Sequence, residues 1–226
     1  MVAMYQFGRN RAVDDAAEAA TRAFSDYIAA EIARRRAEPK DDLLSLLTRS
    51  DEDGATLDDE DIIATAILLL NAGHEATVHA LANGVKALLE AGIRPVGGEA
   101  LGEEILRFDP PLHLFTRFVY EDTEFGGARL KRGDVVGLSL GAATRDPGRF
   151  EEPDTFRPDR YDAGHVSFGA GVHFCLGAPL ARLEMQVALP ILFQRLPNLR
   201  LSGTPRYADR YHFHGLEALN VVWRRP

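Results

Sequence analysis

The sequence contains a single cysteine, Cys175, among its 226 residues. One thiol excludes an intrachain disulfide, and it excludes the paired Cys and His spacings of a structural zinc site. Proteins that contain no disulfide are typical of reducing compartments, so we expect a cytoplasmic location.

Long apolar runs and an excess of positive charge are also absent. The longest apolar run, residues 62–73, is interrupted by Asn71 and is too short to span a bilayer. The first residues lack the apolar core and cleavage pattern of a signal peptide. The formal net charge of -8 is opposite in sign to the charge of most nucleic-acid-binding proteins. We therefore expect neither a membrane anchor nor a nucleic-acid partner.

Apolar residues at helical spacing fill much of the chain and predict helices over residues 13–36, 39–50, 57–91 and 99–109. The helix over 57–91 has a capping box at Thr56 and Asp59 and a stop at Gly92. A further helix follows Cys175, and one apolar face of it is formed by Leu176, Leu180, Leu183 and Val187.

Strand patterns are confined to the second half of the chain. Alternating residues punctuated by glycines over 115–140 predict a small antiparallel sheet, and residues 211–226 predict a final hairpin. Neither repeats nor a clear linker divides the chain. We therefore predict one domain over residues 1–226, mostly α with a minor antiparallel β-sheet.

The segment "FGAGVHFCLG", residues 168–177, surrounds Cys175 with glycines just before a predicted helix. The helix start favours a thiolate, and the glycines let a flat or bulky group approach the backbone. This pattern suits an axial metal ligand. A nucleophile paired with His173 and a buried structural thiol are the alternatives. A phosphate loop is excluded because no Gly-Lys-Ser/Thr ending follows.

The same ten residues match the Phe-x-x-Gly-x-His-x-Cys-x-Gly signature of the haem-thiolate monooxygenases, the cytochromes P450. The resemblance implies haem b as cofactor and Cys175 as its proximal iron ligand. It implies that His173 and Arg117 contact haem propionates and that Phe168 packs against the cysteine loop. Gly169 and Gly177 would line the haem in the same loop.

Two more motifs agree with this resemblance. "EILR" supplies Glu104 and Arg107 as the Glu-x-x-Arg pair of the family, and "FRPDRY" supplies Arg160 as a third member of the network. Taken alone, the Glu-x-x-Arg pair is more often a surface ion pair. The order and spacing of both motifs and the cysteine loop fit the family.

By the same resemblance, the long helix crosses the oxygen-binding face of the haem. Ala72 and Gly73 leave room for the ring and a diatomic ligand, and Glu75 is an acid beside an apolar run. A helix–helix contact between small residues is the simpler alternative. The family threonine is replaced by Ala76, with a hydroxyl one residue later at Thr77. We therefore expect protons to arrive through Glu75 and water.

Substrate contacts are expected, again by resemblance, on the long helix, after the Glu-x-x-Arg helix and near the C-terminus. These residues are Leu69, Leu112, Leu114, Phe115 and Phe213. The substrate would be a small apolar organic molecule. Electrons would come from a separate ferredoxin or flavodoxin, because the chain has no nucleotide- or flavin-binding motif.

The resemblance covers only the C-terminal half of a cytochrome P450. We therefore expect the chain to form a homo-oligomer or to be complemented by the missing N-terminal half. Two functions follow. The first is a haem-thiolate monooxygenase, or a truncated form of one, which inserts an oxygen atom from O2 into its substrate. The second is a non-catalytic remnant with weak or no haem binding that acts as an assembly or binding module. Whether the chain is an active enzyme is left open by the missing half.

Overall fold

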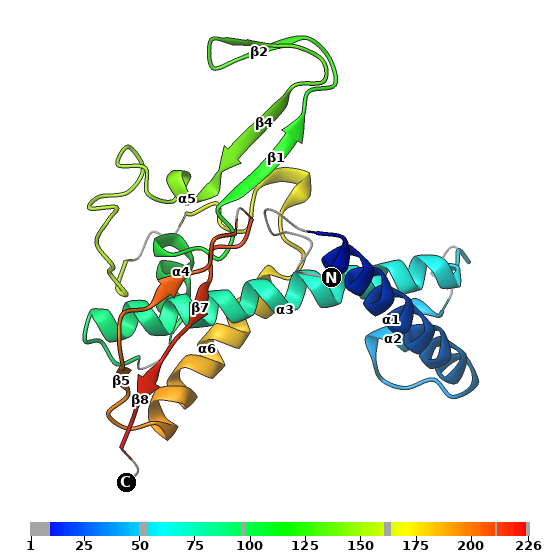
Figure 1. The fold of residues 1–226 in the computed structure, drawn as a ribbon, viewed down its shortest axis with the longest axis horizontal. Helices are drawn as coiled ribbons and strands as arrows, with labels where there is room; N and C mark the ends of the chain where they lie inside the picture. The colour runs from blue at the N-terminus through cyan, green and yellow to red at the C-terminus, as the bar shows by residue number, and fades with distance from the viewer. Residues whose placement is uncertain (1–9, 50–53, 96–97, 161–163, 211, 225–226) are drawn as a thin grey trace. The chain divides into compact units, whose positions relative to one another are not determined.

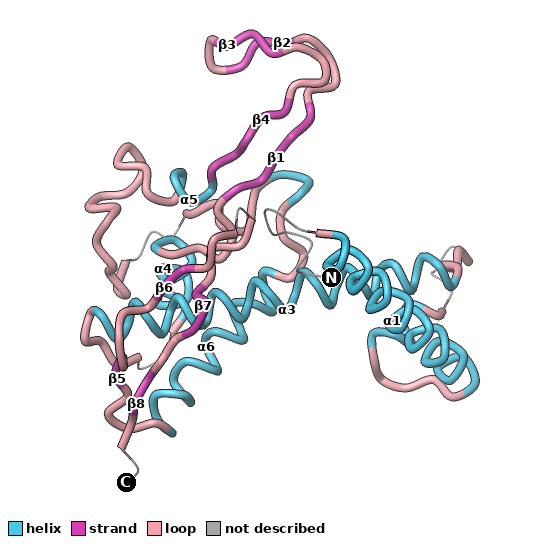
Figure 2. The backbone as a smooth tube through the Cα atoms, in the orientation of Figure 1, coloured by secondary structure: helices cyan, strands magenta, loops and turns pink. Residues whose placement is uncertain are grey.

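A computed structural model describes residues 10–49, 54–95, 98–160, 164–210 and 212–224. The chain divides into two compact units, Met1–Glu75 and Ala76–Pro226. About half of the described chain is helical, and the strands form small antiparallel sheets (Figure 2). The predicted fold class is therefore confirmed. No helix in the described ranges is both long and apolar enough to cross a membrane.

The first unit contains α1 (Arg11–Ala37), α2 (Leu43–Leu47) and the N-terminal part of α3 (Asp59–Glu90). The side chain of Asn10 caps α1 by accepting a hydrogen bond from the Val13 N–H. Three isoleucines are buried at the centre of this unit, with partly buried apolar side chains around them; they are Ile28, Ile32 and Ile62.

The long helix α3 starts differently from the prediction and ends as predicted. Asp58, rather than the pair Thr56 and Asp59, caps the start, because its carboxylate accepts the Asp61 N–H at 2.8 Å. A carboxylate also interacts favourably with the positive end of the helix dipole. At the other end, Gly92 has a φ of 68°, the left-handed conformation that glycine adopts without strain.

The second unit is built on the C-terminal part of α3, on α4 (Glu99–Phe108) and on α6 (Ala178–Arg195). The main core lies among them and includes Leu88, Leu101, Ile105, Leu106, Met185, Leu189 and Phe193. α3 and α4 approach closely at Gly84, where a Cβ atom would lie 2.8 Å from Ile105 Cδ1. A larger residue at this position would press on the Ile105 side chain.

The predicted sheet over 115–140 is present as one long hairpin. β1 (Leu114–Phe118) pairs antiparallel with β4 (Val135–Ser139), and β2 (Thr123–Phe125) pairs with β3 (Ala128–Leu130). Figure 1 shows the hairpin projecting from the helices, with β2 at its tip and the short helix α5 (Leu140–Ala143) at its base.

The prediction of a C-terminal hairpin is wrong for the described residues, because β7 and β8 do not pair with each other. β7 (Leu216–Ala218) pairs with β6 (Arg206–Tyr207), and β8 (Val221–Val222) pairs with β5 (Arg200–Leu201). Both late strands thus pair with the segment that follows α6. An alternating pattern shows that a segment is extended, but it does not show which strand is its partner. Residues 211, 225 and 226 of the predicted hairpin lie outside the described residues.

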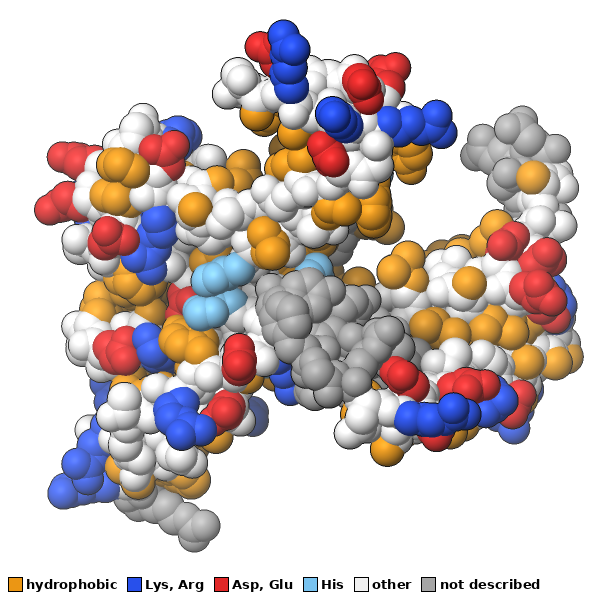
Figure 3. Space-filling view, turned by 45° about the horizontal axis from the view of Figure 1, so that its top comes forward, with side chains coloured by type: hydrophobic (Ala, Val, Ile, Leu, Met, Phe, Trp, Pro, Cys, Tyr) orange, Lys and Arg blue, Asp and Glu red, His pale blue; other side chains and the backbone are white. Residues whose placement is uncertain are grey.

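The apolar face predicted for α6 is exposed. The exposed fractions of Leu176, Leu180, Leu183 and Val187 are 88%, 60%, 55% and 50%. The helix instead buries Met185, Leu189 and Phe193 in the core. Apolar side chains are visible at the surface in the space-filling view (Figure 3). The sequence of α6 is apolar on two sides, so periodicity alone did not identify the side that this chain buries.

Candidate functional site: the cysteine loop

Cys175 lies in a short loop between the 3-10 turn η2 (Gly171–His173) and the start of α6. The thiol is free and exposed. The loop is folded back on itself, because the Cys175 N–H donates a hydrogen bond to the Phe168 carbonyl at 2.9 Å. Gly169 and Gly171 have φ values of 72° and 68°, which other residues adopt only with strain.

The surface around the thiol is apolar and open. The exposed fractions of Val172 and Leu176 are 95% and 88%, and Phe174 is half exposed. A Cβ atom on Gly177 would lie 3.9 Å from the Cys175 sulfur, and no side chain caps the helix that starts there. This arrangement fits a flat apolar cofactor with a metal above the sulfur, since the positive end of the helix dipole favours a thiolate.

A salt bridge beneath the loop holds Phe168. The Arg182 guanidinium lies over the Phe168 ring, 4.7 Å from its centre, and donates to both carboxylate oxygens of Glu103 at 2.6 and 2.9 Å. His165 Nε2 lies 3.3 Å from the same carboxylate. Burial opposes ionisation of Glu103, but His165 and Arg182 outweigh it and lower the pKa of this carboxyl to about 2.

This support was not predicted from the sequence. Glu103 precedes the Glu-x-x-Arg motif directly, and Arg182 follows Cys175 by two helical turns. Their positions next to the two motifs were the only hint in the sequence. No local spacing indicates that Glu103 and Arg182 contact each other.

Glu104, Arg107 and Arg160 form one buried network. The Arg107 guanidinium donates to both oxygens of Glu104, at 2.7 and 2.8 Å, and both side chains are fully buried. Arg160 Nε donates to Glu104 Oε2 at 3.1 Å. Two guanidinium groups therefore share a single buried carboxylate, and the alternative of a surface ion pair does not apply.

The network also fixes the irregular segment before the cysteine loop. Arg107 donates to three backbone carbonyls within residues 144–155, and the Arg157 N–H donates to Glu104 at 2.7 Å. Arg160 donates to the Glu151 carbonyl at 2.8 Å. A segment without regular secondary structure thereby gains partners for its polar backbone groups.

The two predicted propionate contacts are both exposed. Arg117 lies on β1, where its guanidinium donates to the neighbouring Thr116 carbonyl at 2.9 Å. His173 is the last residue of η2. Their contact with haem propionates stays a prediction. Because both side chains are exposed, they are accessible to such a group.

Most of the predicted substrate contacts lie around one isolated β-bridge, between Leu112 and Phe213. Phe115 packs edge-on against His212, with ring centres 5.1 Å apart, and Leu114 begins β1. Leu69 lies on α3 in the other unit and is partly exposed.

The residues predicted to act on the oxygen side all lie on α3. Ala72, Gly73 and Glu75 belong to the first unit and Thr77 to the second. Apart from its chain neighbours and the adjacent backbone of α3, no described atom comes within 4 Å of the place that a Cβ on Gly73 would take. The catalytic role of these residues stays a prediction.

Comparisons with known proteins show which family the chain resembles. Residues 99–203 match the family model of cytochrome P450. The polyketide biosynthesis cytochrome P450 PksS of Bacillus subtilis is 39% identical over 213 residues, which cover 89% of this chain and 53% of PksS. The cytochrome P450 monooxygenase PikC of Streptomyces venezuelae is 41% identical over 228 residues, with 94% and 54% covered.

Solved structures give the same result. The crystal structure of CYP109E1 from Bacillus megaterium in complex with testosterone superposes with a TM-score of 0.86 at 33% identity, over 92% of this chain and 61% of the other. The fold and these matches together define the class of protein. The chain belongs to the cytochrome P450 family, and it spans about half the length of the curated relatives it matches.

Proposed function

We propose that this chain carries the thiolate-ligand half of a cytochrome P450 monooxygenase and binds haem b through Cys175. The observation that carries the proposal is the exposed thiol at an uncapped helix start, surrounded by exposed apolar side chains. When bound, a thiolate-ligated haem supplies the activation of O2 for oxygen insertion into an organic substrate.

Different residues of the chain would hold different parts of this cofactor. Cys175 provides the anionic ligand, while Arg182 and Phe168 hold the loop in place from below. His173 and Arg117 are exposed and chemically suited to carboxylates of the cofactor. Glu75 would move protons, in place of the missing family threonine.

Substrate and electron donor are part of the same proposal. The apolar side chains around the Leu112–Phe213 bridge support a small apolar organic substrate. A separate ferredoxin or flavodoxin would deliver electrons. Because the chain spans half of its relatives, we propose that a second copy or a segment equivalent to their remaining half completes the pocket.

The carbon-monoxide difference spectrum of the reduced protein tests the proposal. We expect a thiolate-type Soret band from protein loaded with haem. Cys175→Ser should abolish the band, and Cys175→His should keep the haem but give an imidazole-type band, because the ligand atom at this position changes. A thiolate-type band that survives in Cys175→Ser would contradict the assignment of the ligand.

The alternative is a non-catalytic remnant that acts as an assembly or binding module. The large exposed apolar side chains beside the cysteine loop support this alternative, since they form a surface that a partner could cover. A folded wild-type protein that stays colourless after incubation with haem would favour this second function.

A further inference from the structure

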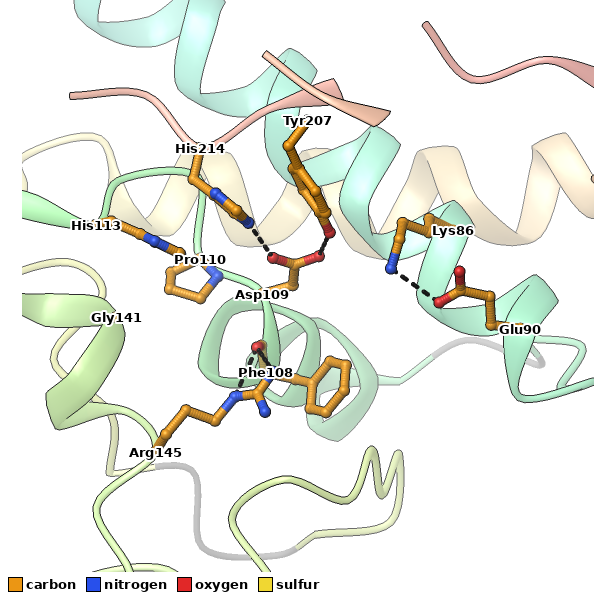
Figure 4. A pocket seen from close by; sticks show the side chains of 10 residues that line it. All are labelled: Lys86, Glu90, Phe108, Asp109, Pro110, His113, Gly141, Arg145, Tyr207 and His214. Carbon is orange, nitrogen blue, oxygen red and sulfur yellow. Dashed lines mark hydrogen bonds and ion pairs between the residues drawn. The ribbon is translucent and has the colours of Figure 1, made fainter. Parts of the chain in front are cut away.

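Besides the Glu104 network, two clusters of charged side chains adjoin α4, and one of them is complete in itself. It lies in a polar pocket of about 370 Å³ (Figure 4). One oxygen of the Asp109 carboxylate lies 3.1 Å from His214 Nε2, and the other accepts a hydrogen bond from the Tyr207 hydroxyl. The Asn83 side-chain amide donates to the carbonyls of Asp109 and His214, at 3.2 and 2.9 Å. The buried carboxylate is thus satisfied by protein groups, and no residue of the cysteine loop lines the pocket.

The other cluster, formed by Glu103, His165 and Arg182, joins the two ends of the cysteine loop. His165 precedes the loop in the chain and Arg182 follows it on α6, and both approach the Glu103 carboxylate. Arg182 donates to both carboxylate oxygens, at 2.6 and 2.9 Å, and His165 Nε2 lies 3.3 Å away. Cys175 lies between these two residues in the sequence. One carboxylate of α4 therefore holds both flanks of the loop that carries the thiol.

The flank before the loop has a second attachment to α4. The Ser167 hydroxyl donates to the Leu106 carbonyl at 2.7 Å, and the Ser167 N–H donates to His165 Nδ1 at 3.2 Å. Because Nδ1 accepts this hydrogen bond, the neutral ring carries its hydrogen on Nε2, which faces Glu103. The orientation of the buried imidazole is thus set from both of its nitrogens.

The Arg182 guanidinium links this cluster to Cys175. It lies over the Phe168 ring, 4.7 Å from its centre, and the Phe168 carbonyl accepts the Cys175 N–H at 2.9 Å. A planar guanidinium suits both contacts, since its edge binds a carboxylate and its face stacks on an aromatic ring. The hydrogen bonds to Glu103 chiefly, and the negative charge of Cys175 to a smaller extent, raise the pKa of Arg182. A positive charge is therefore held near the sulfur.

We propose that Glu103 and Arg182 are positioning residues for the Cys175 ligand, and that the charge of Arg182 raises the potential at which a bound haem iron accepts one electron from its donor. This inference rests on the proposed ligation of haem by Cys175. A positive charge near the thiolate favours the reduced iron, which carries one positive charge less. Groups that orient a metal ligand also tune the properties of the metal that it binds.

Hydrogen exchange of the haem-free chain, followed by NMR, tests the positioning role. We expect Arg182→Gln to accelerate exchange of the Cys175 amide at least about fivefold, the factor that corresponds to a cation–π contact of about 1 kcal/mol. Exchange of the Leu189 amide, in the buried part of α6, should change less. Arg195→Gln removes a positive charge from the other end of α6 and is the matched control, with unchanged exchange at Cys175. Equal acceleration at Cys175 and Leu189 in Arg182→Gln, or none at Cys175, would overturn the positioning role.

Redox titration of the haem-loaded chain tests the charge effect. Arg182→Gln should lower the midpoint potential of the iron, whereas Glu103→Gln should raise it, because the guanidinium then lacks its counter-charge. Arg182→Lys keeps the charge but loses the planar contacts. Its potential should stay closer to that of the wild type, while exchange at Cys175 is still accelerated. Shifts of the same sign in Arg182→Gln and Glu103→Gln would contradict the proposal, since a loss of packing alone moves both potentials in one direction.

The two measurements also separate this inference from the proposed function. Absence of a thiolate-type band in the haem-incubated wild type would overturn the proposed function and, with it, the effect on the potential. The exchange rates would still decide the positioning role. A thiolate-type band together with an unchanged potential in Arg182→Gln would overturn the charge effect and leave the proposed function intact.

Discussion

Two adjacent glutamates of α4 support different parts of the second unit. Glu104 is fully buried and is shared between Arg107 and Arg160, whereas Glu103 binds Arg182 beneath the cysteine loop. The first set was predicted because Glu104 and Arg107 form a local motif. Glu103 and Arg182 are 79 residues apart, so no local spacing indicated their contact.

Acid should weaken the protein through Glu103. The pKa of this carboxyl is lowered to about 2 in the folded chain, from an ordinary value of 4.5. Its ionised form therefore stabilises the fold fully above pH 4.5, and this contribution is lost as the pH falls toward 2. We expect Glu103→Gln to be less stable than the wild type in urea at pH 7, with a difference that shrinks between pH 4.5 and 2.

The control for this measurement is Glu184→Gln, which changes an exposed glutamate of α6. Its difference from the wild type should be small at every pH. If the destabilisation by Glu103→Gln stayed constant from pH 7 to pH 2, the salt bridge would not be its source.

At the scale of elements, helices were predictable because each has its own periodic pattern and end signals. The helices of both units lie where their apolar spacing placed them, and Gly92 ends α3 as expected. Strand pairing was less predictable. The residues that β7 and β8 pair with lie 9 or more positions earlier in the sequence, across an intervening loop, so no tight turn indicated the partner strands. Periodicity also did not identify the buried side of α6, because that choice depends on which neighbours the chain contains.

Two glycines of α3 should respond oppositely to alanine. Alanine is favoured over glycine in a helix by about 1 kcal/mol, so Gly73→Ala, whose Cβ meets no described atom within 4 Å apart from its chain neighbours and the adjacent backbone of α3, should stabilise the chain. At Gly84 the new methyl group would press on the fully buried Ile105, and such overpacking costs about 1–3 kcal/mol.

Urea unfolding of both variants measures this difference. We expect Gly84→Ala to unfold at lower urea than Gly73→Ala. Equal midpoints for the two variants would mean that α3 and α4 have room to separate.

At the scale of the whole molecule, large apolar side chains are exposed in a chain that spans about half the length of its relatives. The apolar long helix and the half-length resemblance predicted that apolar side chains would be exposed. They did not predict which side chains these would be. The apolar stripe of Leu180, Leu183 and Val187 on α6 is one such surface.

We expect the isolated chain to self-associate through apolar surface of this kind. Leu180→Lys combined with Leu183→Lys should shift sedimentation toward the monomer, because charges on the stripe oppose its burial. Thr204→Lys adds a charge in the loop between β5 and β6, away from α6 in the sequence, and should leave association unchanged. A monomeric wild-type chain at all concentrations would contradict this expectation.

The contacts of Asn83 have a consequence for the order in which the protein acquires its structure during synthesis. Its side chain joins the end of α4 to His214, a partner 131 residues later in the chain. The ribosome makes His214 131 residues after Asn83. This part of the interior of the second unit therefore stays incomplete while the intervening segment is synthesised, and the nascent chain must stay unaggregated during that time.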